Sequence, residues 1–306
     1  MPFFRSLFVA ALLCLCAPVF AAAQAFSVRP EWTRPFPPFR IAGNLYYVGS
    51  EDLASFLIVT PQGNILINGN LTTSPAQIKH SVEALGFHFS DIKILLISHA
   101  HSDHAGGSAA ILQQTHAKYF VMDADVRAIE SGGHTDFRFG SDKSMWYPSA
   151  HVDRVLHDGD AISLGGTTLV AHLTAGHTPG TVTYTFDEPK DGRTLHVVIV
   201  GSPSVLESYK LIGNTTYPHI ADDFRHQFVV LKSLPCDIFL GAHASYFDLK
   251  EKYDRLQHGD RNAFLDSAGY AQFVADREKA FEAAYQKQHA AQKSSVNARP
   301  GAHPAL

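Results

Sequence analysis

The chain has 306 residues, a formal net charge of −4 and 45% hydrophobic residues, which is enough apolar material to bury a large core. Its 25 basic and 29 acidic residues form no basic run or stripe, so nucleic acid is not expected as a partner. No internal linker interrupts the sequence, and α/β folds of this length commonly remain one domain.

The N-terminal segment has the layout of a secretory signal peptide. Arg5 precedes an apolar stretch over residues 7–20, and small residues follow it. We therefore expect residues 1–25 to be removed, with cleavage after Ala23 or Ala25, and the mature protein to be periplasmic. The apolar stretch is short for a membrane span and no stop-transfer pattern follows it, so no membrane association is expected after cleavage.

The mature chain is expected to form one domain over residues 26–290, followed by a disordered tail at 291–306 that is rich in small and polar residues. Removing the signal peptide leaves Cys236 as the one cysteine, so an internal disulfide is excluded and stability must come from the core. We expect a monomer.

The first half of the mature chain contains apolar runs of strand length interleaved with helix-like segments. A turn at Pro61–Asn64 joins two of these strands in a hairpin. The expected strands are 45–48, 56–60, 65–68, 92–98 and 119–122, and the expected helices are 75–85, 109–114 and 124–131.

The second half repeats this organisation. Its first expected helix, 222–233, has Asp222 or Asp223 as the capping residue, and a long helix is expected over 262–288. Because each half has its strands first and its helices outside them, we predict two sheets packed face to face between helical layers. The expected strands of this half are 167–172, 181–186, 195–200 and 237–240.

Three imidazoles and one carboxylate occur within six consecutive residues, at the end of the predicted strand 92–98. This spacing places them on a strand-to-helix turn and not on a helix face. In an alternating backbone His99 and His101 point to the same side and can share one ion, while Asp103 and His104 can turn toward a second. Imidazole and carboxylate ligands suit zinc, iron or manganese, and the excess of histidine favours zinc.

A site for two ions needs more ligands than this run supplies. His177, in Gly176–Gly180, and His243, in Gly241–Ser245, each follow a strand-like run and lie among small residues. Strand ends of this kind form exposed functional edges, so these two histidines are the further ligand candidates. The other histidines of the chain lack this context.

Taken together, these segments closely resemble the metallo-β-lactamase superfamily. The resemblance covers essentially the whole mature chain and rests on His99-x-His-x-Asp-His104, Gly176–Gly180 and Gly241–His243. It implies an α/β fold, a four-layer αβ/βα sandwich, with a site for two Zn²⁺ ions. It also implies a ligand partition, in which one zinc takes His99, His101 and His177 and the other takes Asp103, His104 and His243.

The superfamily includes many activities, so the fold does not settle the substrate. Lactonases and related hydrolases of the superfamily usually carry a metal-bridging Asp after the strand between the third and last ligand segments. Here that strand ends in Gly201-Ser202, so serine replaces the bridging carboxylate. This replacement, together with segments such as Pro38–Gly49 and Leu211–Pro218, resembles the third subclass of class B β-lactamases. Two departures are the lack of a cysteine partner for Cys236 and the stretch Asn68–Asn70, which is expected near the site.

The resemblance implies hydrolysis of β-lactam antibiotics, carbapenems included, by a zinc-bound hydroxide that is available near neutral pH. Asp103 is expected to be a ligand that also orients this hydroxide, and Tyr209 to assist the developing oxyanion. Ser202 and Ser204 are the candidates for binding the substrate carboxylate. The aromatic side chains of Phe137 and Trp146 are expected to line the cleft.

Two other functions compete with this one. A different hydrolase of the same fold, such as a lactonase, is disfavoured by Ser202. A non-catalytic periplasmic zinc-binding protein would account for the histidines, but structural zinc sites are closed four-ligand cages and do not need a set of ligands for two ions.

Overall fold

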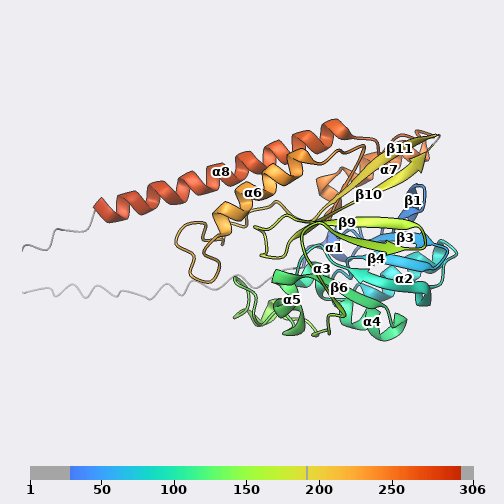
Figure 1. Cartoon of the computed structure of the whole chain (residues 1–306), viewed down its shortest axis with the longest axis horizontal. Helices are drawn as coiled ribbons and strands as arrows, with labels where there is room; N and C mark the ends of the chain where they lie inside the picture. Colours follow the sequence, from blue (N-terminus) through green and yellow to red (C-terminus); the bar gives the residue numbers. More distant parts are fainter. Residues whose placement is uncertain (1–27, 191, 298–306) are drawn as a thin grey trace, which may run out of the picture.

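The computed structural model of the chain describes residues 28–190 and 192–297, so the expected signal peptide at 1–25 lies outside the described residues. Two β-sheets pack face to face, and helices cover the outer face of each (Figure 1). The expected αβ/βα sandwich is therefore confirmed. Within the described residues, no helix is both long and apolar enough to cross a membrane.

The first sheet contains seven strands among the described residues, in the order β1-β2-β3-β4-β5-β6-β7. Strands β1 to β4 pair antiparallel, whereas β4 to β7 run parallel. The parallel strands place the carboxyl ends of β5 and its neighbours at one edge of the sheet. The strands are β1 (Phe39–Ala42), β2 (Leu45–Tyr47), β3 (Phe56–Thr60), β4 (Gly63–Ile67), β5 (Ile92–Leu96), β6 (Lys118–Met122) and β7 (Arg154–Leu156).

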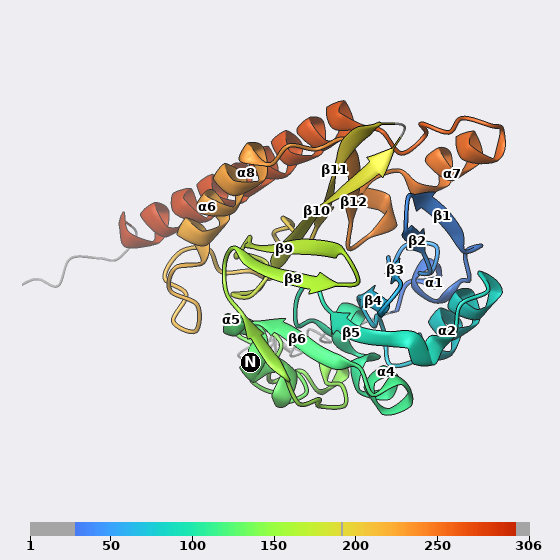
Figure 2. The same ribbon diagram turned by 45° about the vertical axis from the view of Figure 1, so that its right-hand side comes forward.

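The second sheet has the described strand order β12-β11-β10-β9-β8, with β11 and β12 parallel and the other pairs antiparallel. Figure 2 shows this sheet lying between the first sheet and helices α6 and α8. Its strands are β8 (Asp160–Leu164), β9 (Thr167–Leu173), β10 (Val182–Lys190), β11 (Arg193–Val200) and β12 (Ile238–Gly241).

The helices divide between the two outer faces. Helices α2 (Pro75–Ala84), α4 (Ser108–Thr115) and α5 (Asp123–Glu130) lie on the first sheet, and α6 (Ile220–Ser233) and α8 (Ser267–Asn297) lie on the second. Shorter helices complete the chain: α1 (Pro30–Thr33), α3 (Ser102–Ala105), α7 (Leu249–Gln257), and the 3-10 turns η1 (Phe89–Asp91), η2 (Lys143–Met145) and η3 (Ala244–Tyr246).

The main core lies between the two sheets, where alternate strand residues point inward. Val182, Tyr184 and Phe186 of β10 are buried on this face, for example, and pack in the same cluster as Phe56 and Ile67 of the first sheet. A separate apolar cluster lies between the first sheet and its helices. Burial of both sheet faces explains why the parallel strands are mostly apolar in sequence.

The structure differs from the sequence predictions at several helix ends. Helix α6 begins at Ile220 with His219 as the N-cap residue, so Asp222 and Asp223 lie in its first turn and are not the cap. There the carboxylates still interact favourably with the helix dipole. Helix α8 begins at Ser267, five residues later than expected, because Leu265 forms a β-bridge with Ile238.

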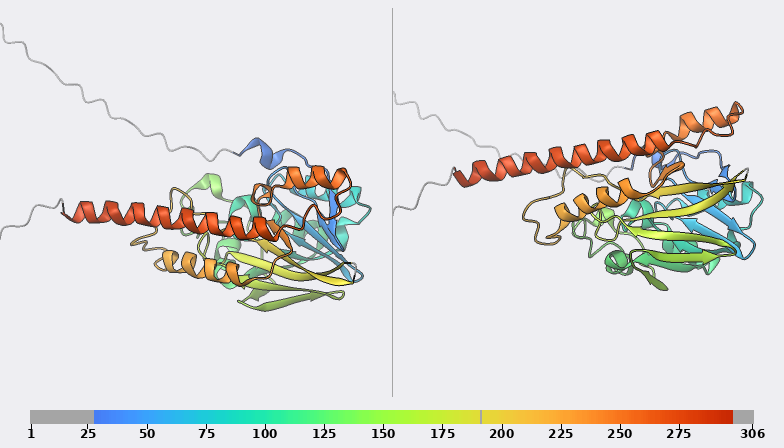
Figure 3. Two further views of the ribbon diagram at one scale, coloured as in Figure 1. Left: turned by 90° about the horizontal axis from the view of Figure 1, so that it is seen from above. Right: turned by 45° about the horizontal axis from the view of Figure 1, so that its top comes forward.

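Helix α8 also continues to Asn297, past the expected end at 288. Residues 291–297 of the expected disordered tail are therefore helical, and the rest of that tail lies outside the described residues. Figure 3 shows the C-terminal part of α8 projecting beyond α6. The sequence analysis did not predict β1, β7, β8, α1 or α7, because these elements are short or, like α7, have few apolar residues.

Candidate metal centre

The first group of ligand candidates lies just beyond the end of β5. Asn68, at φ 69°, accepts a hydrogen bond from the backbone N–H of Ser98 at 2.8 Å and donates to the carbonyl of Ala54 at 3.2 Å. These bonds hold the chain one residue before His99. The expectation that Asn68 lies near the site is confirmed.

The chain then turns into α3, a single helical turn that follows His101. Asp103 and His104 therefore project from a short helix, and not from the irregular turn that the sequence analysis expected. A Cβ on Gly107 would lie 2.2 Å from the carbonyl oxygen of Gly69, so glycine is needed where these two loops touch. The backbone N–H groups of Gly69 and Asn70 donate to the carbonyl of His104, each at 3.0 Å.

The first group of converging side chains consists of His99, His101 and His177, all of which are buried. Nδ1 of His101 lies 3.1 Å from Nε2 of His177, while Nε2 of His99 is buried without a hydrogen-bond partner among the described residues. His177 is oriented by its other nitrogen, Nδ1, which bonds to the carbonyl oxygen of Ser204 at 2.7 Å. Three imidazole nitrogens thus face one point.

The second group lies beside the first and is formed by Asp103, His104 and His243. Nε2 of His104 and Nε2 of His243 are 3.2 Å apart, and a carboxylate oxygen of Asp103 lies 3.4 and 3.7 Å from them. His99 is close to both groups, since its ligand atom also lies within 4.8 Å of those of Asp103 and His104. The structure therefore brings all six candidates together.

The donor set fits two zinc ions. Two nitrogens bound to one tetrahedral zinc at about 2.0–2.1 Å lie roughly 3.3 Å apart, close to the separations of 3.1 and 3.2 Å in the two histidine pairs. Burial and the neighbouring histidines lower the pKa of His104 to about 4 and that of His177 to about 3. The imidazoles of His104 and His177 are therefore neutral at physiological pH, which is the form that binds metal.

Carboxylates outside the ligand groups orient two of the histidines, and the sequence analysis missed them. Asp52 accepts from Nδ1 of His243 at 3.0 Å, from the indole N–H of Trp32 at 3.0 Å and from the backbone N–H of Ser245 at 3.0 Å. Burial raises the pKa of Asp52, but the His243 bond and charge outweigh it and hold the pKa well below the ordinary value.

His101 has a similar partner. A carboxylate oxygen of Asp136 lies 3.5 Å from its Nε2, opposite the nitrogen that faces His177. Burial lowers the pKa of His101, but Asp136 outweighs this effect and raises it. The sequence analysis gave neither Asp52 nor Asp136 a role, so these roles follow only from the folded structure.

Asp125 on α5 connects the loops that carry His101 and His177. Its buried carboxylate accepts from the backbone N–H groups of Ala100 at 2.8 Å and Gly180 at 2.9 Å, and from the hydroxyl of Thr178 at 2.7 Å. Burial raises the pKa of Asp125 to about 6 even though these three donors favour the charged form. One side chain therefore sets the spacing of two ligand-bearing loops.

His101, Asp103, His177 and His243 line a cleft of about 390 Å³. Ser202 and Ser204, the candidates for substrate binding, both line it, and each hydroxyl lies close to the phenol oxygen of Tyr246, at 3.1 and 3.2 Å respectively. Tyr246 follows His243 by three residues and was not a sequence candidate. The three hydroxyl groups form a polar patch next to the ligand groups.

Tyr209 does not reach this cleft. Its side chain is 2% exposed and its hydroxyl donates to the carbonyl of His177 at 2.6 Å. This placement does not support the expected role in assisting an oxyanion, because the proton of the hydroxyl is already used inside the core. Tyr209 instead fixes the backbone of a ligand candidate.

The expected aromatic walls are also corrected. Phe137 packs on Tyr209 and Tyr217, and the Trp146 ring lies tilted against His134 with ring centroids 3.9 Å apart. Neither is among the residues that line the cleft. Phe139 and Met145, on the same segment of chain, line it instead. The sequence thus indicated the right stretch of chain, but which of its side chains face the cleft depends on how that stretch folds.

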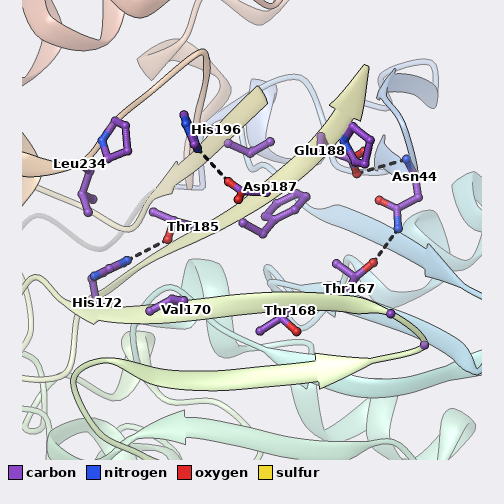
Figure 4. Close-up of a pocket in the computed structure, with 16 residues that line it drawn as sticks. Asn44, Thr167, Thr168, Val170, His172, Thr185, Asp187, Glu188, His196 and Leu234 are labelled. Carbon is purple, nitrogen blue, oxygen red and sulfur yellow. Dashed lines mark hydrogen bonds and ion pairs between the residues drawn. The ribbon is translucent and has the colours of Figure 1, made fainter. Parts of the chain in front are cut away.

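A larger cavity, of about 800 Å³, lies elsewhere, along β9, β10 and β11 (Figure 4). Its two histidines are already paired, His172 with the hydroxyl of Thr185 at 2.8 Å and His196 with the carboxylate of Asp187 at 2.8 Å. Because these polar groups satisfy each other across the strands and do not converge on one point, the cleft at the buried histidines is the better candidate site.

Comparison with known proteins agrees with this geometry. Residues 53–243 match the sequence profile of the metallo-β-lactamase superfamily, a range that includes all six ligand candidates. The native FEZ-1 metallo-β-lactamase from Legionella gormanii is 54% identical, with 84% of this chain and 98% of that chain covered and a TM-score of 0.83. The class B3 di-zinc metallo-β-lactamase LRA-12 from an Alaskan soil metagenome is 38% identical, with 84% and 97% covered and a TM-score of 0.80.

Matches to curated proteins are weaker. A hydroxyacylglutathione hydrolase of Nitrobacter hamburgensis is 26% identical over 205 residues, which are 64% of this chain and 68% of that protein. Another curated match spans only 38% of the relative's length. The chain is thus much more similar to the metallo-β-lactamase structures than to these other hydrolases.

Proposed function

Since the chain belongs to the metallo-β-lactamase superfamily, we propose that it is a zinc-dependent β-lactamase that hydrolyses the lactam amide of β-lactam antibiotics, carbapenems included. The observation that carries the proposal is the pair of adjoining ligand groups, members of which line an open cleft. His99, His101 and His177 would hold one zinc, and Asp103, His104 and His243 the other. Similarity to a di-zinc class B3 enzyme supports the count of two.

When bound, zinc supplies Lewis acidity and lowers the pKa of water from 15.7 to about 7, so that a hydroxide nucleophile is available at neutral pH. The protein's own groups then have defined tasks. Asp103 orients the nucleophile, because its carboxylate lies between the two histidines of its group. Asp52 keeps the Nε2 of His243 free of hydrogen, because it accepts the proton on Nδ1. Ser202 and Ser204 bind the carboxylate of the substrate from the side of the cleft.

A lactonase or thioester hydrolase of the same superfamily is the second candidate, and one observation opposes it. The position where such enzymes are expected to carry a bridging Asp is Ser202, whose hydroxyl lies 3.1 Å from that of Tyr246. The third candidate, a zinc-binding protein without turnover, is disfavoured by the open cleft above the ligand groups, because structural zinc sites are closed.

The proposal also includes export to the periplasm and a monomeric state. Export rests on the N-terminal sequence, residues 1–25, which lies outside the described residues. Mass spectrometry of the protein recovered from a periplasmic fraction would show a new N-terminus after Ala23 or Ala25. An intact N-terminus in the cytoplasmic fraction would contradict export, and sedimentation of the same sample would test the monomer.

The function is tested by hydrolysis of a chromogenic cephalosporin and a carbapenem by the purified mature chain, with zinc and after chelation. We expect turnover of both substrates that is lost on chelation and restored by zinc. His99→Ala and His243→Ala should abolish or severely reduce it, whereas His80→Ala, an exposed histidine on α2, should not. Near-normal turnover with full zinc content in either ligand variant would refute the assignment. A folded two-zinc protein with no β-lactam turnover would favour the lactonase.

A further inference from the structure

Arg277 on α8 lines the same cleft as Ser202 and Ser204. Its guanidinium carbon lies 5.4 Å from the ring centroid of Tyr246 and 5.0 Å from that of Phe273. These distances are typical of cation–π contacts, which hold the planar group in place without using its N–H donors. Helix α8 thus brings a cation beside the hydroxyl patch.

Arg277 has no anionic partner within the described part of the chain. The ion pairs formed by arginines there involve Arg34, Arg154, Arg225 and Arg255. A half-buried guanidinium with five free donors is matched in geometry to a carboxylate, which it can bind with two parallel hydrogen bonds. The donors of Arg277 are therefore available to a ligand in the cleft.

The neighbours of Arg277 strengthen this interpretation. The Tyr246 ring lies between Arg277 and His243, at a centroid distance of 5.2 Å from the latter, and its hydroxyl lies near those of Ser202 and Ser204. An anion held by the hydroxyl patch would therefore lie between the ligand groups and Arg277. The other charged side chains that line the cleft are Arg29, Asp52 and Asp103, and the two carboxylates would repel an anion.

We propose that Arg277 determines specificity for β-lactams with a free ring carboxylate, which it binds together with Ser202, Ser204 and Tyr246. The proposal rests on the β-lactamase function above and assigns a residue of the C-terminal helix to substrate recognition. The metal centre performs the hydrolysis, whereas Arg277 acts on binding, so its effect should appear in KM more than in kcat.

The test compares a chromogenic cephalosporin that has a free ring carboxylate with its methyl ester. In Arg277→Gln we expect KM for the acid to rise on the order of five- to tenfold, with kcat changed less and KM for the ester unchanged. Arg277→Lys should be intermediate, since it keeps the charge but loses the planar fork. The matched control is Lys279→Gln, which removes the same charge from an exposed position on α8.

Binding to the zinc-free protein separates this proposal from the proposed function. Calorimetric titration after chelation should show the acid bound more tightly than the ester, with the difference lost in Arg277→Gln, whether or not the enzyme turns over. Equal effects on acid and ester, or none, would overturn the proposal. An equal change in Arg29→Gln would also overturn it. Arg29 lines the cleft next to Trp32, so an equal effect there would show that long-range charge attraction alone explains the tighter binding of the acid.

Discussion

At the scale of single residues, the orientation of a ligand depends on groups that no motif reveals. His243 can present Nε2 to the metal centre only if its other nitrogen carries the proton, and Asp52 provides the acceptor for that proton at 3.0 Å. The same carboxylate accepts from Trp32 and from the backbone of Ser245. It therefore orients the ring and also ties α1 to the loop after β12.

Asp52→Asn should weaken the second zinc position. An amide has one acceptor oxygen where the carboxylate has two, so at least one of the three donors would lose its partner. We expect zinc affinity or activity to fall roughly 10- to 100-fold. Zinc content after dialysis, measured by elemental analysis, and recovery of turnover at high zinc would check this. Unchanged zinc content together with unchanged kcat would show that His243 does not depend on Asp52.

Glu188 allows a test of buried charge far from the metal centre. It lies on the core side of β10, 4% exposed, and accepts one hydrogen bond from the backbone N–H of Asn44 at 3.3 Å (Figure 4). Burial raises its pKa above the ordinary value of about 4.3. The protonated Glu188 side chain therefore contributes its full stabilisation of the folded state below the ordinary pKa. This contribution is lost as the pH rises through the raised pKa of the folded state.

Glu188→Gln should therefore be more favourable for stability at pH 8 than at pH 4, because glutamine keeps the acceptor oxygen and never ionises. Urea unfolding of both proteins across this range gives the difference in unfolding free energy. The charge of Arg40 opposes the effect, so Arg40→Gln should enlarge it. A difference that does not change with pH would show that Glu188 ionises normally.

At the scale of elements, α8 contributes to the site over more than one of its turns. Arg277 lines the cleft, and about three turns later Gln288 donates to the carbonyl of Tyr209 and accepts from the backbone N–H of Leu211, both at 2.8 Å. Through Tyr209, these bonds support the loop that follows β11 and carries Ser204. Helix α8 therefore supports a loop that lines the cleft.

Gln288→Ala should cost about 1–3 kcal/mol of stability, because it leaves two part-buried backbone groups without their partner. We also expect a rise in KM, since Ser204 lies on the loop that is loosened. Thermal unfolding and steady-state kinetics would measure both, with exposed Lys287→Ala as the control. If KM and stability match those of the control, α8 does not support the loop.

At the scale of the whole molecule, the metal centre lies where the two sheets meet. The backbone N–H of Val182 on β10 donates to the carbonyl of Ser98 at 2.9 Å, and the hydroxyl of Tyr184 donates to that of Ile97 at 2.9 Å. Asp125, from the first half, binds Thr178 and Gly180 of the second. The ligands therefore come together when the two halves of the chain pack against each other.

Asp125→Ala should cost about 3 kcal/mol or more, because three buried donors lose their acceptor. We expect the first zinc position to weaken as well, since the loops bearing His101 and His177 are no longer held together. Chemical unfolding of the zinc-free protein separates the loss of stability from the loss of metal. Asp123→Ala, an exposed carboxylate in the same helical turn, serves as control, and an equal effect there would refute the coupling.

Local patterns account for what could be predicted. Dense ligand runs and glycine-rich strand ends mark His99, His101, Asp103, His104, His177 and His243, and the apolar periodicity places most strands. Short or polar elements such as β7 and α7 carry too little periodicity to be recognised. The roles of Tyr209, Phe137 and Trp146 were misplaced because a pattern identifies a loop and not the direction in which its side chains point.

Ligand identity and spacing are properties of neighbouring residues, so the sequence alone indicates a histidine-rich metal centre. It also determined the sandwich, since each half buries its apolar strands beneath its own helices. The groups that surround the ligands, in contrast, depend on how distant parts of the chain fold together. Asp52 lies 191 residues before His243 in sequence, and Asp125 lies 55 before Gly180, so these contacts exist only once the two sheets have packed.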